Sequence, residues 1–217
     1  MKIGIIGGGQ LGKMMVAEAK KMGFYVAILD PTFNCPAHSM VDKHIVANFD
    51  DREAIRQLAK DCQVLTYEFE HIDVEVLLEL EKAGHIIYPT PKSLALIQNK
   101  YIQKKCLEEK KIPIPKFSQV HDVEDIKKAG EQWGYPLILK TCTGGYDGKG
   151  NAVIHDVEDI VSAYTQLGQG EIPLMVEEWI YFQKEISVLA CRGIDGEVAI
   201  YPIGENDHHD NILIETR

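Results

Sequence analysis

The sequence predicts an α/β protein in which a parallel, doubly wound sheet is followed by a second unit of mixed helices and strands. Three observations support this prediction. Short apolar runs alternate with amphipathic segments up to about residue 90, which is the pattern of βαβ units. Prolines at 89, 91, 113 and 115 then interrupt the alternation. Beyond them, β-like runs follow one another through glycine-rich turns, as in hairpins.

The first unit opens with a strand, a turn and a helix. Residues 2–6 form a short apolar run, with Lys2 at its start, that stops at Gly7-Gly8-Gly9. Residues 11–22 then place apolar side chains at helical spacing. Residues 25–29 are the next apolar run, so this stretch has the length of a βαβ unit. The remaining elements expected here are strands at 44–46 and 64–69, and helices that begin after the N-cap residues Asp50 or Asp51 and Asp73.

The second unit is expected after a boundary near residues 90–100. A helix from Ser93 to about Glu109 carries the chain out of the first unit. Asp195-Gly196 is a strong hairpin signal. The other elements expected are strands at 116–120, 136–141, 151–155, 174–180, 184–192 and 197–202, and helices at 123–133 and 157–167. Residues 212–217 have the pattern of a further strand, so we expect the protein to continue past Arg217.

Composition excludes several classes of partner. The 217 residues carry 33 acidic and 23 basic side chains, for a formal net charge of −10. No run of Lys and Arg could form a track for nucleic acid, and no apolar run approaches a membrane span, so we expect neither partner. Phosphorylated ligands would need a local cluster of donors and a divalent cation. Five cysteines without a Cys-x-x-Cys pair, and an N-terminus without a signal peptide, favour a cytoplasmic protein.

A glycine motif, Gly7-x-Gly9-x-x-Gly12, lies between the first strand and the first helix, and Asp30 ends the next strand. This is the arrangement of a dinucleotide-binding site. The physical basis is broader, because glycines let the backbone approach an anion and a helix N-terminus presents unpaired N–H groups. Three interpretations stay open: another phosphate-bearing ligand, NAD, or a turn with a purely structural role.

A second glycine-rich loop, residues 143–150, follows the strand that carries Lys140. Phosphoryl transfer requires a lysine and backbone N–H groups of this kind, which favours a nucleoside triphosphate over a dinucleotide. An exposed lysine at a strand edge is the alternative. Glu177-Glu178 ends a later strand and Glu185 starts the one after it. These carboxylates either accept hydrogen bonds from an adenine amino group or ribose hydroxyls, or are solvated. His208 either contacts phosphate or metal or has no such role.

The run Tyr67-Glu68-Phe69-Glu70 closes the fourth strand expected in the first unit. Ligands of open α/β sheets bind outside the carboxyl ends of the strands. Glu68 and Glu70 are expected on one face of the strand. They form either a site for an amino-bearing substrate or a pair of solvated carboxylates.

Three motifs together carry a resemblance to a known family. They are Gly8-Gly9-Gln10-Leu11-Gly12-Lys13-Met14, Thr66-Tyr67-Glu68-Phe69-Glu70 and, above all, Lys140-x-x-Thr143-Gly144-Gly145-Tyr146-Asp147-Gly148-Lys149-Gly150. With these motifs the chain resembles the N5-carboxyaminoimidazole ribonucleotide synthetases of the ATP-grasp family. The resemblance implies a Rossmann-like pre-ATP-grasp substrate domain at 1–95, an ATP-grasp small (lid) subdomain at 96–175, and the start of an incomplete ATP-grasp large subdomain at 176–217.

The resemblance also implies an activity. The family is a group of ligases of purine biosynthesis that use ATP to activate bicarbonate as carboxyphosphate and then carboxylate the amino group of 5-aminoimidazole ribonucleotide. It implies Mg²⁺, or Mn²⁺ in its place, and a homodimer. The metal ligands are expected beyond Arg217, so the 217 residues alone are expected to be inactive.

The resemblance assigns roles to individual residues. Asp147, with Tyr146 and Lys149, is the catalytic candidate, and Asp147 is hypothesised to manage the proton of the attacking amine. Lys100 stands where many members have Arg. The ATP-binding residues implied are Lys100, Lys140, Gly145, Tyr146, Asp147, Gly148, Lys149, Gly150, Asn151, Glu177, Glu178, Trp179, Ile180, Glu185 and His208. The substrate-binding residues implied are Gly9, Gln10, Leu11, Glu68 or Glu70, Tyr146 and Lys149.

Other interpretations of the same motifs remain. A different ATP-grasp ligase, either a formate-dependent glycinamide ribonucleotide transformylase or a biotin-carboxylase-like enzyme, shares parts of the pattern. An NAD-dependent oxidoreductase would rest on the first glycine motif alone. A non-catalytic nucleotide-binding module is the third possibility.

Overall fold

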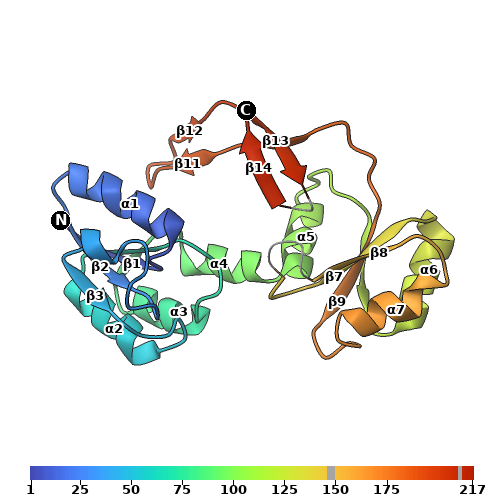
Figure 1. The fold of residues 1–217 in the computed structure, drawn as a ribbon, viewed down its shortest axis with the longest axis horizontal. Coiled ribbons are helices and arrows are strands. Elements are labelled where there is room, and N and C mark those ends of the chain that lie inside the picture. Colours follow the sequence, from blue (N-terminus) through green and yellow to red (C-terminus); the bar gives the residue numbers. More distant parts are fainter. Residues whose placement is uncertain (146–149, 210–211) are drawn as a thin grey trace. The chain divides into compact units, whose positions relative to one another are not determined.

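The computed structural model describes residues 1–145, 150–209 and 212–217 (Figure 1). The chain divides into two compact units, residues 1–103 and residues 104–217. The predicted residues Tyr146, Asp147, Gly148 and Lys149 lie outside the described residues. No helix among the described residues is both long and apolar enough to cross a lipid bilayer.

The first unit contains a five-stranded parallel sheet of order β3-β2-β1-β4-β5, as the alternating pattern predicts. This order is that of a doubly wound sheet, which begins at a central strand and continues outward on both sides. Its elements are β1 (Lys2–Ile6), α1 (Gln10–Lys21), β2 (Tyr25–Leu29), the 3₁₀ turn η1 (His38–Met40), β3 (Lys43–Ile45), α2 (Arg52–Asp61), β4 (Val64–Tyr67), α3 (Val74–Lys82), β5 (Ile86–Ile87) and α4 (Pro91–Gln98).

Helices cover both faces of this sheet because successive strand residues point to opposite sides. Ile5 and Ile28 belong to a core on one face, with side chains of α1. Ile6 and Leu29, their neighbours in sequence, belong to a larger core on the other face, with side chains of α2, α3 and α4. All four side chains are almost completely buried. The predicted fold class of the first unit is therefore confirmed.

The helix ends follow the capping chemistry of the sequence in most places. Asp51 and Asp73 accept hydrogen bonds from the first-turn amides of α2 and α3, as predicted. The single helix predicted from residue 93 to 109 is wrong, because α4 ends at Gln98 and α5 (Lys100–Glu109) begins after Asn99. Asn99 has an extended backbone, and its side-chain oxygen accepts from the amides of Tyr101 and Ile102. An asparagine in this conformation ends one helix and caps the next.

The second unit is built on a four-stranded antiparallel sheet of order β6-β9-β7-β8. Two helices, α6 and α7, contribute to the core on one face of this sheet, beside Leu137, Leu139 and Val176. The hairpin predicted between residues 136–141 and 151–155 is confirmed as β7–β8. The elements are β6 (Phe117–Val120), α6 (Val123–Trp133), β7 (Leu137–Thr141), β8 (Asn151–Ile154), α7 (Asp159–Gln166) and β9 (Leu174–Glu178).

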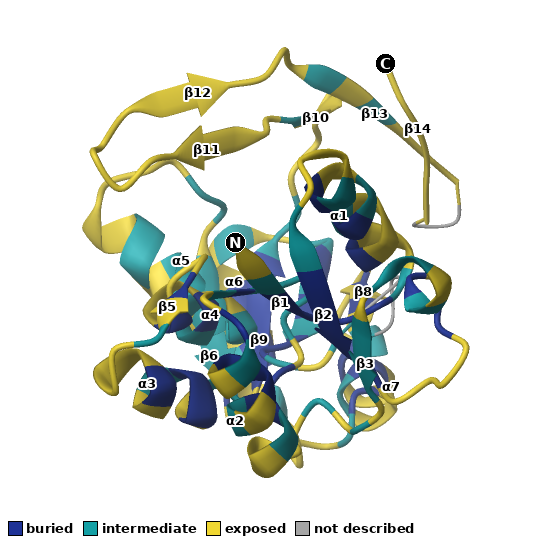
Figure 2. Ribbon diagram, turned by 90° about the vertical axis from the view of Figure 1, so that its left-hand side faces the viewer, coloured by how far each residue is buried: buried dark blue, intermediate teal, exposed yellow. Residues whose placement is uncertain are grey.

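The last five strands form two small sheets that are mostly exposed, drawn largely yellow in Figure 2. One pairs β10 (Glu185–Ser187), β13 (Gly204–His209) and β14 (Ile212–Thr216), and the other pairs β11 (Ala190–Arg192) with β12 (Val198–Ile200). The continuous strand predicted over 184–192 is wrong, because its two halves pair with different partners. The hairpin predicted at Asp195-Gly196 is confirmed between β11 and β12.

Candidate functional site

The face of the β6-β9-β7-β8 sheet opposite α6 and α7 carries charged side chains. Along β7, Leu137 and Leu139 point into the core, so Ile138 and Lys140 point to the opposite face. Lys140 lies directly across from Asn151 of β8 in the sheet register. Side chains of directly paired residues share a face, so these two polar side chains are neighbours.

A buried carboxylate joins two lysines on this face. Glu177 of β9 is 5% exposed. Its Oε2 accepts a hydrogen bond from Lys140 Nζ at 3.0 Å. Lys104 Nζ lies 3.2 Å from Oε1, although the angles of this ion pair do not make it a hydrogen bond. One carboxylate thus contacts two ammonium groups through different oxygens.

The adjacent carboxylate, Glu178, is used differently. Its Oε1 accepts a hydrogen bond from the backbone amide of Lys116 at 2.8 Å, and its Oε2 lies 3.2 Å from Lys116 Nζ. The backbone hydrogen bond from Lys116, with help from the ammonium group, lowers the pKa of Glu178. Glu178 therefore ties the end of β9 to the segment before β6.

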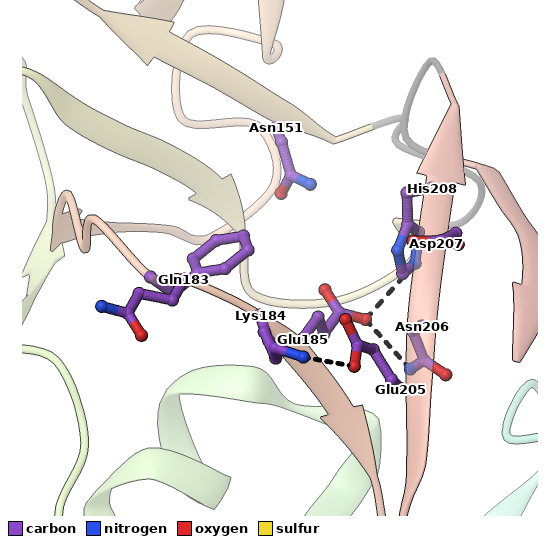
Figure 3. Close-up of a pocket in the computed structure, with 9 residues that line it drawn as sticks. Asn151, Gln183, Lys184, Glu185, Glu205, Asn206, Asp207 and His208 are labelled. Atoms are coloured by element: carbon purple, nitrogen blue, oxygen red, sulfur yellow. Dashed lines mark hydrogen bonds and ion pairs between the residues drawn. The ribbon is translucent and has the colours of Figure 1, made fainter. Parts of the chain in front are cut away.

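A polar cavity of about 560 Å³ lies between β8, β10 and β13 (Figure 3). In it, His208 Nε2 lies 3.3 Å from Glu185 Oε1, and Asn206 Nδ2 donates to the same oxygen at 3.3 Å. Lys184 Nζ donates to Glu205 Oε2 at 2.6 Å. The lining residues are Asn151, Phe182, Gln183, Lys184, Glu185, Glu205, Asn206, Asp207 and His208. Carboxylate, imidazole and amide groups here can bind hydroxyl groups and oxyanions.

The structure brings some of the expected ATP-binding residues together. Asn151, Glu185 and His208 line the same cavity, and Lys140 is paired with Asn151 across the sheet. Glu177 lies beside Lys140.

The other expected ATP-binding residues do not line this cavity. Trp179 has its ring edge-on to Tyr181, with 6.4 Å between ring centroids, and Ile180 is exposed. Lys100 begins α5 in the first unit. Gly145 and Gly150 flank the residues that are not described, and Gly150 has a φ of +86°, which favours glycine.

Sequence reasoning missed Lys104, Lys184, Glu205 and Asn206. A signal for Lys104 exists, because it stands four residues after Lys100 and so shares its helix face. Nothing in the local sequence distinguishes Lys184, Glu205 and Asn206 from ordinary polar strand residues. Their proximity arises from the pairing of β10 with β13, which joins residues far apart in the chain.

The first glycine loop is occupied by a side chain of the chain itself. The Glu68 carboxylate accepts hydrogen bonds from the amides of Gly9, at 2.8 Å, and Gly12, at the N-terminus of α1. A Cβ atom at Gly7 would lie 2.4 Å from Glu68 Cγ, and one at Gly12 would lie 2.6 Å from the Gly7 carbonyl oxygen. The glycine spacing therefore has a structural reason that needs no dinucleotide, namely room for an internal anion at a helix N-terminus.

Asp30 also binds the first glycine loop, whereas Glu70 does not. Asp30 is buried, and its two oxygens accept from the amides of Gly8 and Thr32 at 2.8 Å each. Glu70 does not enter the loop; its Oε1 lies 3.5 Å from His71 Nε2. Within the described part of the chain, the amides of Gln10 and Leu11 have no hydrogen-bond acceptor. These two amides remain available to a ligand.

Residues 1–98 match the family model described as the ribonucleotide synthetase preATP-grasp domain, and residues 105–217 match the ATP-grasp domain. The chain is 41% identical to an N5-carboxyaminoimidazole ribonucleotide synthase of Bacillus subtilis, over 99% of this chain and 56% of the relative. The chain thus spans about half the length of the curated relatives it matches.

Solved structures agree with this resemblance. An N5-carboxyaminoimidazole synthetase of Staphylococcus aureus complexed with ADP superimposes with a TM-score of 0.94 at 37% identity, over 99% of this chain and 57% of that one. An N5-carboxyaminoimidazole synthase of Aspergillus clavatus, in complex with ADP and 5-aminoimidazole ribonucleotide, gives 0.88 at 37% identity over 98% and 55%. The resemblance seen in the three motifs therefore extends along the chain, which belongs to the ATP-grasp family and begins with a ribonucleotide synthetase preATP-grasp domain.

Proposed function

We propose that the protein containing this chain is an ATP- and bicarbonate-dependent ligase that carboxylates 5-aminoimidazole ribonucleotide to N5-carboxyaminoimidazole ribonucleotide in purine biosynthesis. The observation that carries the proposal is the placement of Lys140 directly across from Asn151, which lines the cavity that also holds Glu185 and His208. A lysine beside a polar cavity is suited to a triphosphate and its ribose. The relatives complexed with ADP and with the ribonucleotide support the choice of ligands.

The proposed reaction has two steps. An oxygen of bicarbonate attacks the γ-phosphorus of ATP, the bond from that phosphorus to the ADP oxygen breaks, and carboxyphosphate forms. The amino nitrogen of the ribonucleotide then attacks the carboxyl carbon, the carbon–oxygen bond to phosphate breaks, and the nitrogen loses a proton. The products are the carbamate, ADP and phosphate, and catalysis consists mainly of positioning and charge neutralisation.

The nucleotide is proposed to bind along the open sheet face and the cavity. Lys140 contacts the phosphates, and the resemblance assigns Lys100 and the segment 145–151 to the same ligand. Residues 177–180 hold the adenine, with Glu178 contributing its backbone because its carboxylate is bound to Lys116. In the cavity, Glu185 binds the ribose and His208 lies close to the nucleotide.

The ribonucleotide is proposed to bind at the first unit. The amides of Gln10 and Leu11 are the donors for its phosphate, since the Gly9 amide already donates to Glu68. Glu70 or Glu68, with Tyr146 and Lys149, faces the aminoimidazole, and Asp147 accepts the proton from the attacking amine.

The proposal also includes Mg²⁺, with Mn²⁺ as a substitute, a homodimer, a cytoplasmic location and the three-part division at residues 95 and 175. The residues described do not fit a resident metal on their own. No three His, Cys, Asp or Glu side chains come together as metal ligands within 1–145, 150–209 and 212–217. We therefore assign no metal ligand in this part of the chain and derive no step through the metal.

The proposal is tested by following ADP release from the full-length protein. We expect ADP release that requires bicarbonate and is stimulated by 5-aminoimidazole ribonucleotide. Turnover driven by formate and glycinamide ribonucleotide would instead assign the protein to another branch of the family. Saturable binding of NADH, followed by its fluorescence, would support an oxidoreductase.

A further inference from the structure

We infer that Lys104 is a positioning residue for nucleotide binding, which neutralises Glu177 and so leaves the ammonium group of Lys140 available to the phosphates of a nucleotide. The inference rests on the proposed function, because it takes Lys140 as a phosphate ligand. Lys104 does not belong to any of the three motifs that carry the resemblance. Its role follows from its position against Glu177.

The geometry separates the two lysines on the carboxylate. Lys140 Nζ donates to Glu177 Oε2 at 3.0 Å, whereas Lys104 Nζ lies 3.2 Å from Oε1. Because each ammonium group contacts its own oxygen, one can leave without disturbing the other.

Burial explains why Glu177 needs a cation at all times. Its side chain is 6% exposed, and a buried carboxylate without a charged partner is strongly destabilising. The side chain of Lys140 is 24% exposed and that of Lys104 is 16% exposed. Lys140 is therefore the member of the cluster that can turn toward a ligand, and Lys104 is the member that can remain with Glu177.

The surroundings of Lys104 hold it away from the cavity. Its ammonium group lies 5.8 Å from the centre of the Phe117 ring, within the range of a cation–π contact. Phe117 pairs with Glu177 across β6 and β9, whereas Asn151 of the cavity pairs with Lys140 across β7 and β8. Lys104 thus contacts the β6–β9 side of the sheet, and Lys140 adjoins the β8 side.

Charge counting gives the consequence for binding. Two ammonium groups and one carboxylate have a net charge of +1, so a phosphate that takes Lys140 leaves a neutral Lys104–Glu177 pair. Without Lys104, Lys140 and Glu177 would form a neutral pair by themselves. A phosphate would then have to compete with a buried carboxylate for the only lysine of the pair.

The test measures the affinities of ATP and adenosine for the full-length protein by calorimetry. We expect Lys104→Met to weaken ATP binding by about tenfold, equivalent to about 1.4 kcal/mol, and to leave adenosine binding unchanged, because only the phosphates use Lys140. Lys105→Met is the matched control. Lys105 lies on the same helix, 5.2 Å from the same Phe117 ring, but its ammonium group is 2.9 Å from Glu108. The Lys105→Met variant should bind ATP and adenosine as the wild type does.

A second substitution separates positioning from direct phosphate contact. Adding Glu177→Gln to Lys104→Met should restore the ratio of ATP to adenosine affinity, because the competing charge is gone, and Lys104→Arg should keep the wild-type ratio. The inference would be overturned if Lys104→Met left the ratio of ATP to adenosine affinity unchanged, whether both affinities stayed the same or fell equally. It would also be overturned if Glu177→Gln did not restore the ratio. If Lys104→Met does not fold, Lys104→Gln removes the charge and keeps a donor, and the same outcomes apply.

One further arm distinguishes this inference from the proposed function. Lys140→Ala should lower the ratio of ATP to adenosine affinity. If it does so while Lys104→Met does not, only the inference fails. If Lys140→Ala leaves the ratio unchanged, the proposed nucleotide site itself is wrong.

Discussion

The two glycine-rich loops of this chain have opposite electrostatic settings. The first, residues 7–12, joins a parallel strand to a helix, and its amides donate to two carboxylates of the same unit, Glu68 and Asp30. The second, residues 143–150, joins two antiparallel strands and follows Lys140, a cation that is paired with the shared carboxylate Glu177. The first loop contains its own anion, whereas the second stands beside a positive charge.

This difference shows what a glycine pattern does and does not indicate. Glycines show that something approaches the backbone closely, but the approaching group can be a ligand or a side chain of the protein. The charges beside each loop show which of its amides are already used by the protein and which are left for a ligand. Glu68 supplies the anion that the helix N-terminus of the first loop favours. The cluster at the second loop has an excess of positive charge, which favours a phosphate.

The largest effect that tests this comparison is expected for Gly7→Ala. Gly7 has a φ of +104°, and its Cβ would lie 2.4 Å from Glu68 Cγ, so both the backbone and the carboxylate must move. We expect a loss of about 3 kcal/mol in the free energy of unfolding, measured with urea.

Gly84→Ala is the control for this substitution. Gly84 has a similar φ of +95°, but no atom lies within 4 Å of its Cβ position. It should cost only about 1 kcal/mol, the strain of a left-handed backbone. Equal losses at the two glycines would show that Glu68 is not the reason for the first glycine.

The next effect is expected at the second loop, for Lys140→Ala. Loss of a charge-assisted hydrogen bond to phosphate should weaken ATP binding by about 2 kcal/mol. Gly7→Ala, if it folds, should have an ATP affinity closer to that of the wild type than Lys140→Ala has, because it alters the other loop. Calorimetric titration of both variants measures the contrast. Unchanged ATP affinity in Lys140→Ala would remove this residue from the site.

A smaller effect is expected for Glu68→Gln. The amide keeps one oxygen acceptor but loses the negative charge at the N-terminus of α1, so the free energy of unfolding should fall by about 1 kcal/mol. Glu70→Gln is the matched control, since Glu70 contacts only His71 through its carboxylate in the described structure. Urea unfolding of both variants measures the difference. A loss at Glu70 as large as at Glu68 would contradict the capping role.

Much of the fold was predictable because local chemistry and tertiary structure agree. Asp51 and Asp73 cap helices in the sequence and in the structure, and the apolar run at residues 2–6 is a central strand buried on both faces. Lys140 was recognisable as a site candidate because it adjoins a glycine loop on its own strand. In these cases the signal and its consequence lie within a few residues of each other.

The wrong or missing predictions depend on contacts between distant residues. Asn99 interrupts a helix through its own side chain, although the apolar pattern continues past it. Glu68 accepts a hydrogen bond from a loop about sixty residues earlier in the chain. Lys104 forms an ion pair with Glu177, which lies on β9, more than seventy residues later. Hydrophobic periodicity carries no information on such pairs, because they are set by strand order and by the length of a side chain.

The smallest effect concerns the pair of neighbouring carboxylates on β9 and has a defined pH dependence. The hydrogen bond from the Lys116 amide lowers the pKa of Glu178 below its ordinary value of 4.5. A carboxylate whose pKa is lowered by folding stabilises the protein above the unfolded pKa, and this contribution is lost as the pH falls through the folded pKa. Glu178→Gln should therefore cost about 0.5 kcal/mol at pH 7. In urea unfolding followed as a function of pH, its difference from the wild type should shrink as the pH falls below 4.5 and disappear once the pH is below the lowered pKa of the folded state. Glu171→Gln, which changes an exposed carboxylate of the same unit, should show no such dependence. A difference that persists undiminished in acid would mean that Glu178 acts through its shape and not through its charge.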